Sequence, residues 1–271
     1  MKTFRSERPD LLILSGDKLR HRYFAAKLLT AFENAALMVE SHAAIASENY
    51  VQEPDAEIRA HFDEFVATER RYFHDFVTAN EELLGNALVR SVPKGAINDP
   101  AVVAHVRDVN PNLIVVHSTS IIKEGIINAF PDRIINLHAG LSPWYRGSGT
   151  NLWPFYNGEL ECVGMTVHYL DPGIDSGDII LQGRPNWEAS DTTHTSGCKN
   201  IILGTELAIR VVERFLTGEP APRHRQDKSL GKLYLKRHFN DEVIRCIRDR
   251  IENGLVAEYA RTPKPLDIVE W

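Results

Sequence analysis

The sequence predicts an α/β fold built on a doubly wound, mostly parallel sheet. Short, continuous apolar runs alternate with longer segments that carry apolar residues at helical spacing, which is the rhythm of successive βα units. The apolar runs contain few polar positions, as expected for strands buried on both faces. With 271 residues, of which 43% are hydrophobic, the chain can form one large domain around a substantial core.

The first βα unit shows the pattern most clearly. Residues 11–15 read LLILS and end at Gly16, and residues 18–32 then place apolar side chains such as Tyr23 and Leu28 at helical spacing. Further strands are predicted at residues 36–39, 87–92, 112–116, 133–137, 164–170 and 178–182. Further helices are predicted at residues 99–109, 120–130 and 195–216.

Two segments interrupt this rhythm. Residues 47–85 are rich in charge and in helix formers, so they predict a helical insertion, either an ordinary packing element or a lid over a site. The pattern weakens after residue 218, which divides the chain into a main α/β domain, residues 1–218, and a small C-terminal appendix, residues 219–271. Residues 223–250 hold nine Lys or Arg against four Asp or Glu, which predicts either a solvated face or an anion site.

Composition excludes several classes of partner. The net charge of −6 argues against a protein that mainly binds nucleic acid. The three cysteines are far apart and match no zinc or disulfide spacing, so they are expected to be buried and unpaired in a reducing compartment. No run resembles a signal peptide or a membrane span, so a cytoplasmic protein without a membrane partner is expected. The sequence leaves homodimer formation open.

The stretch INLHAGLSPWYRG places polar groups where a predicted strand ends. Ligands of parallel α/β sheets bind beyond the carboxyl ends of the strands, and Asn136 and His138 lie at such an end. Their i, i+2 spacing puts both side chains on one face of the strand, with Leu137 on the other. Asp175 lies in a second glycine-bounded loop, DPGIDSG, where its carboxylate could orient His138.

An amide donor beside an imidazole suits a reaction in which negative charge grows on an oxygen while a proton moves. Each of these residue types alone is more often a cap or a turn residue, but three of them at the active end of a sheet favour catalysis. No Ser, Cys or Lys stands out as a covalent nucleophile, and metal-ligand motifs are absent from the sequence. We therefore expect the attacking group to come from the substrate, without a metal.

The segments NLHAGLSPWYRG and GMTVHYLDPGIDSGDIILQ resemble the signature of the folate-dependent formyltransferase family. This family includes glycinamide ribonucleotide transformylase, methionyl-tRNA formyltransferase and sugar-nucleotide N-formyltransferases. Its pattern is Asn-x-His-x-Ser-Leu-Leu-Pro-x-x-(Arg/Lys)-Gly, followed by an aspartate in an (Ile/Val/Leu)-Asp-(Ala/Ser/Thr)-Gly-(Asp/Gln) loop. The clear match covers residues 110–217. The matching residues are Asn136, His138, Pro143, Arg146, Gly147, Asp175 and Gly177.

The resemblance implies a Rossmann-like formyltransferase fold and transfer of a formyl group from 10-formyltetrahydrofolate to a primary amine of a small acceptor. It makes Asn136 and His138 donors to the formyl oxygen and Asp175 the partner of His138. It also implies that folate lies against two segments, although Ser and Thr near residue 119 could equally begin the connecting helix. The implied folate contacts are Thr119, Ile121, Ile122, Lys123, Asp171, Gly173 and Ile174.

Departures from the family pattern bear on the acceptor. Residues 140–143 read GLSP where the family has Ser-Leu-Leu-Pro, and the first loop, SGDKLRH, lacks the Gly-x-Gly-Ser-Asn of the purine enzyme. The altered loop argues against a ribonucleotide glycinamide and favours an amino-sugar nucleotide; its charges either hold a phosphate or simply face solvent. Trp144 and Tyr145 either stack on the acceptor or anchor their loop. The implied acceptor residues are Arg20, Trp144, Tyr145, Arg146, Gly147, Ser148 and Asn151.

Three other functions remain open at this level. The same three catalytic residues could hydrolyse formyltetrahydrofolate, although the family's hydrolases usually carry an N-terminal regulatory domain and the first strand here begins at Leu11. A methionyl-tRNA formyltransferase-like enzyme is a second alternative, with an appendix shorter and less basic than that enzyme's second domain. A non-catalytic folate- or nucleotide-binding protein is the third, since fold alone does not imply activity.

Overall fold

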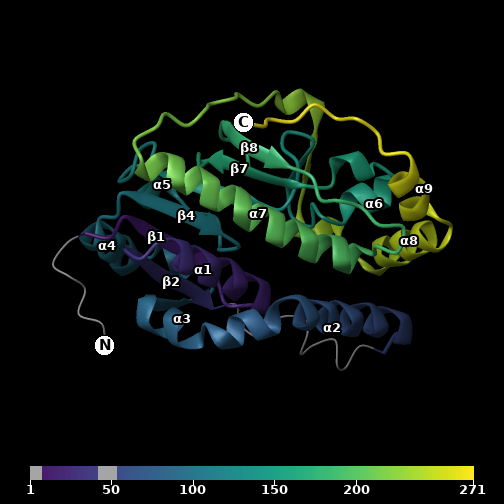
Figure 1. Cartoon of the computed structure of the whole chain (residues 1–271), viewed down its shortest axis with the longest axis horizontal. Helices are drawn as coiled ribbons and strands as arrows, with labels where there is room; N and C mark the ends of the chain where they lie inside the picture. The colour runs from purple at the N-terminus through teal and green to yellow at the C-terminus, as the bar shows by residue number, and fades with distance from the viewer. Residues whose placement is uncertain (1–7, 42–53) are drawn as a thin grey trace.

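The computed structural model of the protein describes residues 8–41 and 54–271. A seven-stranded sheet forms its centre (Figure 1). In spatial order the strands are β3 (Leu88–Pro93), β2 (Ala35–Ser41), β1 (Leu11–Gly16), β4 (Leu113–His117), β5 (Ile134–His138), β7 (Met165–Tyr169) and β8 (Ile179–Gly183). The doubly wound, mostly parallel sheet predicted from the sequence is thus confirmed.

The sheet is parallel only as far as β5. The four pairings among β1, β2, β3, β4 and β5 are parallel, whereas β7 pairs antiparallel with both β5 and β8. Asn136 lies directly opposite His168, and His138 lies opposite Thr166. The loop after β7 therefore starts at the far end of β5 and has to run back along the sheet to reach the catalytic end.

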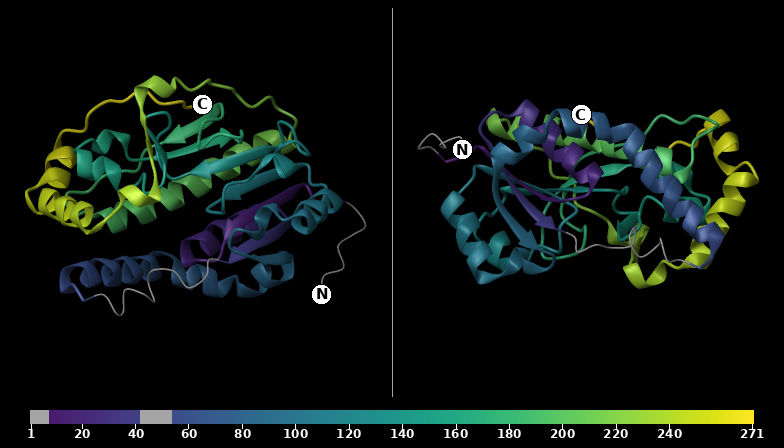
Figure 2. Two further views of the ribbon diagram at one scale, coloured as in Figure 1. Left: turned by 180° about the vertical axis from the view of Figure 1, so that it is seen from behind. Right: turned by 90° about the horizontal axis from the view of Figure 1, so that it is seen from below.

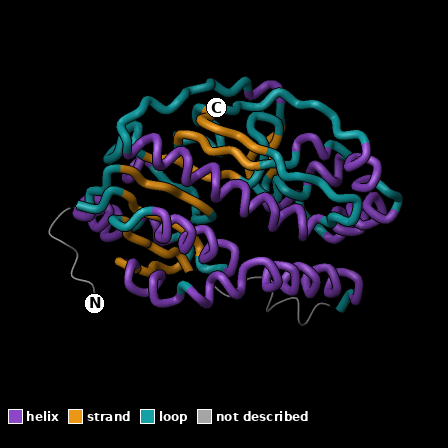
Figure 3. Tube along the Cα trace, in the orientation of Figure 1, coloured by secondary structure: helices purple, strands orange, loops and turns teal. Residues whose placement is uncertain are grey.

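Helices cover both faces of the sheet (Figure 3). The period of two along β1 decides which core each side chain joins: Leu11 and Ile13 pack under one helix layer, and Leu12 and Leu14 pack under the other. The first layer holds α1 (Leu19–Ala31) and α7 (Thr193–Leu216), and the second holds α4 (Pro100–Val109) and α5 (Glu124–Ile127).

Helix α5 is shorter than the predicted helix at residues 120–130. The segment before α5, residues 118–123, is held outside a helix by the side chains of Glu40 and Asn98. The Ser120 N–H donates to Glu40, and the Lys123 N–H donates to Asn98 at 2.8 Å. Since these bonds satisfy the backbone outside a helix, residues 118–123 form an irregular wall at the carboxyl ends of the parallel strands.

The predicted helical insertion is present as α2 (Ala56–Ala79) and α3 (Glu81–Ala87); residues 47–53 of that prediction lie outside the described residues. Phe73 and Val77 of α2 are buried against α1 in the core. The N-terminal half of α2 reaches beyond the sheet toward α8 (Asp241–Glu252), as the right-hand view of Figure 2 shows. There Asp55 caps α2 and also pairs with Arg245 of α8.

The residues after 218 pack back onto the preceding chain. Strand β9 (Lys232–Tyr234) pairs with β6 (Tyr145–Gly147), and α8 and α9 (Leu255–Arg261) share a hydrophobic cluster with α6 (Trp153–Asn157). The Gln182 N–H donates to the Val269 carbonyl at 2.7 Å, which ties the C-terminal tail to β8. Short 3₁₀ turns lie at Ala96–Asn98, Leu160–Cys162, Lys228–Leu230 and Lys236–His238. The described helices include none that is both long and apolar enough to cross a membrane.

Candidate active site

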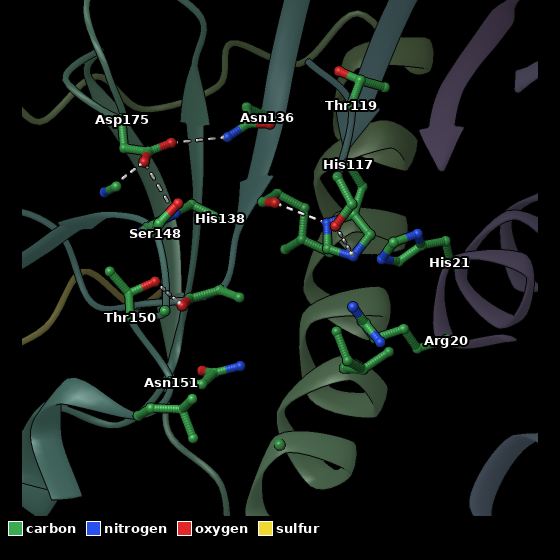
Figure 4. Close-up of a pocket in the computed structure, with 18 of the residues that line it drawn as sticks. Arg20, His21, His117, Thr119, Asn136, His138, Ser148, Thr150, Asn151 and Asp175 are labelled. Atoms are coloured by element: carbon green, nitrogen blue, oxygen red, sulfur yellow. Dashed lines mark hydrogen bonds and ion pairs between the residues drawn. The ribbon is translucent and has the colours of Figure 1, made fainter. Parts of the chain in front are cut away.

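Asn136 and His138 lie at the carboxyl end of β5, on the same face of the strand. Leu137, between them, is buried in the core on the opposite face. His138 is only 6% exposed, although it lines a cavity together with Asn136. The alternation predicted from the i, i+2 spacing therefore brings both side chains to the cavity wall (Figure 4).

Asp175 reaches this pair because its loop folds back over the sheet. The residue has a φ of 47°, and its backbone carbonyl accepts a hydrogen bond from the Gln226 amide at 3.0 Å. One carboxylate oxygen accepts the Gly147 N–H at 2.9 Å, and the other accepts the Asn136 amide at 3.4 Å. The carboxylate is thereby held between the two loops that the sequence singled out.

Gly147 allows this close approach of the two loops. Its φ is +96°, and an added Cβ would lie 2.0 Å from the Tyr234 carbonyl oxygen of the neighbouring strand β9. Both facts exclude a larger side chain without backbone movement. A glycine at this position consequently lets the Gly147 N–H point at Asp175 while the Gly147 backbone packs closely against β9.

Asp175 is ionised despite its burial. Burial by itself would raise the pKa of this carboxyl group, but the neighbouring His138 and the Gly147 N–H hold the pKa well below its ordinary value. The Nδ1 of His138 lies 3.3 Å from Asp175, and its Nε2 lies 2.9 Å from the Tyr145 carbonyl oxygen. Both partners are hydrogen-bond acceptors, so each ring nitrogen of His138 has an acceptor placed to receive an N–H.

His168 is a member of this cluster that the sequence reasoning missed. Its Nε2 lies 3.1 Å from the Asn136 amide nitrogen and 3.6 Å from the Asp175 carboxylate. Its Nδ1 lies 2.7 Å from the Tyr169 carbonyl, so Nδ1 carries a proton and Nε2 can accept from Asn136. The only signal in the sequence is a histidine inside a predicted strand. The antiparallel register that places this histidine opposite Asn136 cannot be predicted from the sequence of one strand.

The cluster opens into a cavity of about 700 Å³. Most of the residues predicted to bind a ligand line this cavity. Those residues are Thr119, Ile121, Ile122, Asp171, Gly173, Ile174, Arg20, Gly147, Ser148 and Asn151. In Figure 4 His138, Asp175 and Asn151 lie on one side of the cavity, and Arg20 and His117 lie on the other.

The irregular wall at residues 118–123 is rigidly supported from behind. Glu40, at the end of β2, is fully buried and accepts both the Ser120 N–H at 2.5 Å and the Gly95 N–H at 2.8 Å. In front of this wall Ile121 is 58% exposed and faces the cavity. This wall therefore combines an exposed, large apolar side chain with backbone polar groups, a combination that suits a flat, partly polar ligand.

Four predicted ligand residues do not line the cavity. Lys123 is exposed outside it, and Arg146 lies on β6, whose backbone pairs with β9. Trp144 and Tyr145 belong to the hydrophobic cluster of the C-terminal segment, where the Tyr145 hydroxyl bonds Glu159 and its ring stacks on Tyr234 at 5.4 Å. Both aromatic residues therefore anchor their loop in this structure.

The wall opposite the catalytic cluster comes largely from α2. His61, Phe62 and Phe65 line the cavity there, and His194 at the start of α7 joins them. Arg20 pairs with the buried Glu69 of α2 at 2.5 Å. The helical insertion is thus both a packing helix and a cavity wall, which the sequence alone had left as alternatives.

Two further groups bear on the chemistry. Cys198 lines the cavity, but burial raises the pKa of its thiol to about 12, so the thiolate is not available as a nucleophile. Burial lowers the pKa of His117 to about 4, and this imidazole is therefore neutral beside the catalytic end. No group of three or more His, Cys, Asp or Glu side chains within residues 8–41 and 54–271 is arranged to hold a metal ion.

The chain belongs to the formyl transferase family, whose family model matches residues 22–212. Among curated proteins, it is 33% identical over 150 residues to a methionyl-tRNA formyltransferase of Syntrophus aciditrophicus, which covers 55% of this chain and 47% of that relative. The chain thus spans about half the length of the curated relatives it matches.

Solved structures of N-formyltransferases share the fold. A sugar N-formyltransferase from a Shewanella species superposes with a TM-score of 0.58 at 16% identity, over 90% of this chain and 88% of that one. An N-formyltransferase from Helicobacter canadensis, solved with folinic acid and dTDP-3-aminofucose, gives a TM-score of 0.54 at 17% identity, over 86% and 72% of the two chains. These identities establish a shared fold, and the family model confirms the resemblance found in the sequence.

Proposed function

We propose that the protein is an N-formyltransferase that moves the formyl group of 10-formyltetrahydrofolate to a primary amine of a small acceptor. The observation that carries this proposal is the cluster of Asn136, His138 and Asp175 at the mouth of one cavity. The Asn136 amide and the His138 imidazole face the same space, and the partly buried Asp175 carboxylate contacts both of them. This arrangement suits the growth of negative charge on a carbonyl oxygen.

The residues of one half of the cavity fit the folate donor. The wall at residues 118–123 offers backbone groups and the exposed Ile121, and the loop with Asp171, Gly173 and Ile174 closes the slot from the other side. A planar heterocycle with polar edges needs such a combination of apolar faces and fixed backbone partners. When bound, the folate supplies the formyl group in a form ready for attack by an amine.

The catalytic side chains then have distinct tasks. Asn136 donates a hydrogen bond to the formyl oxygen as it becomes anionic, and His138 donates its Nδ1–H to the same oxygen by exchanging its 3.3 Å contact with Asp175 for that bond. The Asn136 amide nitrogen contacts Asp175 at 3.4 Å and His168 at 3.1 Å. Because the contact with Asp175 is the longer one, the N–H on that side can turn toward the substrate, and the contact with His168 keeps the amide in place. Asp175 orients His138 before the reaction and relays the proton that the attacking amine loses to the folate nitrogen, whose bond to the formyl carbon breaks as tetrahydrofolate leaves.

We further propose that the acceptor is an amino sugar carried on a nucleotide. The Helicobacter canadensis structure contains such an acceptor, dTDP-3-aminofucose, together with a folate, which supports this choice for a related fold. Lys18 and Arg20 lie at the cavity beside the start of α1, where the backbone N–H groups of a helix terminus favour a phosphate.

The direct test is to incubate the protein with 10-formyltetrahydrofolate and a panel of amines and to measure tetrahydrofolate release. The panel contains dTDP- and UDP-linked amino sugars, glycinamide ribonucleotide, and a control without amine. We expect release that depends on a nucleotide-linked amino sugar. Release that is independent of every amine and accompanied by formate would instead establish a formyltetrahydrofolate hydrolase.

Methionyl-tRNA formyltransferase is the second candidate, because the curated relatives carry that name. The net charge of −6 weighs against it, since phosphate-rich partners usually select basic surfaces. Charged methionyl-tRNA in the same assay decides the point. Formylation of the tRNA that weakens steeply with added salt would replace our proposal by this one.

A further inference from the structure

One stretch of α7 presents bare backbone to the cavity. Gly197 lies inside this helix and lines the cavity, and a Cβ added there would have no described atom within 4 Å beyond its own helix and chain neighbours. Glycine inside a helix destabilises it relative to alanine, and packing does not demand the small residue here. The open space in front of Gly197 is therefore available to a ligand that needs a flat surface.

Two histidines flank this bare stretch. His61 of α2 and His194 of α7 have ring centroids 4.5 Å apart, and they are 8% and 5% exposed. Among the described residues neither imidazole has a hydrogen-bond partner, although both rings line the cavity. Neither ring has a nitrogen that is both without a partner and closed off from solvent. Their nitrogens are consequently free to bond a group that enters the cavity.

A third polar group is aimed at the same space. The buried Asn200 of α7 donates its amide to the Asn151 side-chain oxygen at 3.1 Å. This bond leaves the Asn151 amide nitrogen free, and Figure 4 shows that nitrogen turned toward the middle of the cavity. Phe65 completes the wall with an apolar ring 5.7 Å from the ring of His194.

The charges of this part of the cavity are already matched. Arg20 pairs with Glu69 at 2.5 Å, and its guanidinium stacks on Phe65 at 5.4 Å. Burial lowers the pKa of both His61 and His194 to about 4, so both rings are neutral near neutral pH. Among the described residues that line this part of the cavity, a charged group would find no unpaired counter-charge beside Gly197, whereas an uncharged ring with hydrogen-bonding edges would satisfy the imidazoles and the amide.

We propose that Gly197, His61, His194 and Phe65 form a subsite for an uncharged, planar heteroaromatic ring, which is the nucleobase of the acceptor. The ring would lie flat against Gly197, with its polar edges toward the two imidazoles and the Asn151 amide. This inference rests on the proposed function and deepens it, because it places base recognition on the inserted helix α2.

Isothermal titration calorimetry with uridine, uridine monophosphate and ribose 5-phosphate tests the chemistry of the subsite. We expect uridine and uridine monophosphate to bind and ribose 5-phosphate to bind at least about tenfold more weakly, which corresponds to about 1.4 kcal/mol. Ribose 5-phosphate binding as tightly as uridine monophosphate would overturn the proposal. A parallel titration with 5-formyltetrahydrofolate tests the donor site: if this titration fails, the proposed function fails, whereas failure of the nucleosides alone removes only the subsite.

Two glycines offer a matched pair of variants. Gly197→Ala and Gly85→Ala each add a methyl group to a helix in open space, but Gly85 lies on α3 away from the cavity. Neither change should lower the melting temperature. We expect Gly197→Ala to weaken uridine monophosphate several-fold and Gly197→Leu to abolish its binding, with affinity for 5-formyltetrahydrofolate unchanged. Equal nucleotide affinity in the Gly197→Leu and Gly85→Ala proteins would contradict the subsite.

His61→Phe separates the role of the imidazole from that of its volume. This variant keeps an aromatic ring against His194 but removes both nitrogens. The expected result is at least about a fivefold loss of uridine affinity, as for one lost hydrogen bond, with an unchanged melting temperature. An unaltered uridine affinity would show that the histidines do not recognise the base.

Discussion

At the scale of single residues, the candidate chemistry depends on the hydrogen-bond partners that orient the side chains of His138 and Asn136. His138 has a carbonyl oxygen beside one ring nitrogen and a carboxylate beside the other, so two acceptors fix the orientation of its ring. Asn136 is fixed by the ring of His168 across the strand pair. These bonds preorganise the donors before substrate arrives, which is the condition under which such donors lower a barrier most effectively.

Replacing His138 by alanine should remove one of the two donors to the developing oxyanion. We expect kcat for tetrahydrofolate release to fall by about 10²–10³, the usual consequence of losing one such donor. The exposed His74 of α2 supplies the matched control, because His74→Ala removes an imidazole far from the cavity. Similar rates for the two variants would mean that His138 has no catalytic task.

His168 is expected to act as a positioning residue through Asn136. His168→Leu removes the acceptor of the Asn136 amide, and we expect kcat to fall about tenfold while KM for the donor changes little. His168→Gln can restore an acceptor near the same place and should recover part of the lost rate. A rise in KM without a change in kcat would assign His168 to binding instead.

At the scale of secondary-structure elements, the site is assembled by segments that leave regular structure. The wall at residues 118–123 is not helical because Glu40 and Asn98 take its backbone groups, and the loop after β7 runs back to deliver Asp175. Helix α2 contributes packing at one end and a cavity wall at the other. Each element therefore combines a structural role with a position at the cavity.

Glu40 links the sheet to the donor wall, so its replacement should affect binding of the donor. In Glu40→Gln an amide nitrogen would face either the Gly95 or the Ser120 N–H, and one buried donor would lose its acceptor. We expect a loss of about 1–3 kcal/mol in the free energy of unfolding and weaker binding of 5-formyltetrahydrofolate. Glu33→Gln, at an exposed position before β2, should change neither quantity in denaturation and calorimetry. Unaltered folate affinity in Glu40→Gln would separate this wall from the donor site.

At the scale of the whole molecule, neutral histidines tie stability to pH. Burial lowers the pKa of His61, His117 and His194 from the ordinary 6.5 to about 4. Between these two values the unfolded chain binds more protons than the folded one, so the contribution to stability is fully present above pH 6.5 and is lost as the pH falls toward 4.

Urea unfolding at several pH values should show this dependence. We expect the free energy of unfolding to decrease by several kcal/mol as the pH falls from about 7 to about 4, since each of the three groups can contribute up to about 3 kcal/mol. His61→Phe should flatten the slope because one of the three groups is gone. A free energy of unfolding that stays constant down to pH 4 would show that these imidazoles are not held neutral by the fold.

The C-terminal segment also acts at this scale. Its helices share a hydrophobic cluster with residues around Trp153 and Phe155, and Tyr234, Leu235 and Phe239 line the cavity. The residues after 218 thus contribute to the cavity, while the domain boundary expected at residue 218 stays a prediction. The stretch 223–250 is largely exposed, and Arg245 and Arg248 of that stretch pair with acidic residues at the start of α2.

The order of the seven strands of the main sheet, and the place of Asn136, His138 and Asp175 at strand ends and in a loop, could be predicted from the sequence alone. The reason is that apolar periodicity, glycine-bounded turns and i, i+2 spacing are local properties of the chain. Only the tertiary structure decided that β7 runs antiparallel and brings His168 opposite Asn136, that Trp144 and Tyr145 anchor a loop, and that α2 walls the cavity. Those outcomes depend on register and packing between segments far apart in the chain, and no local pattern records them.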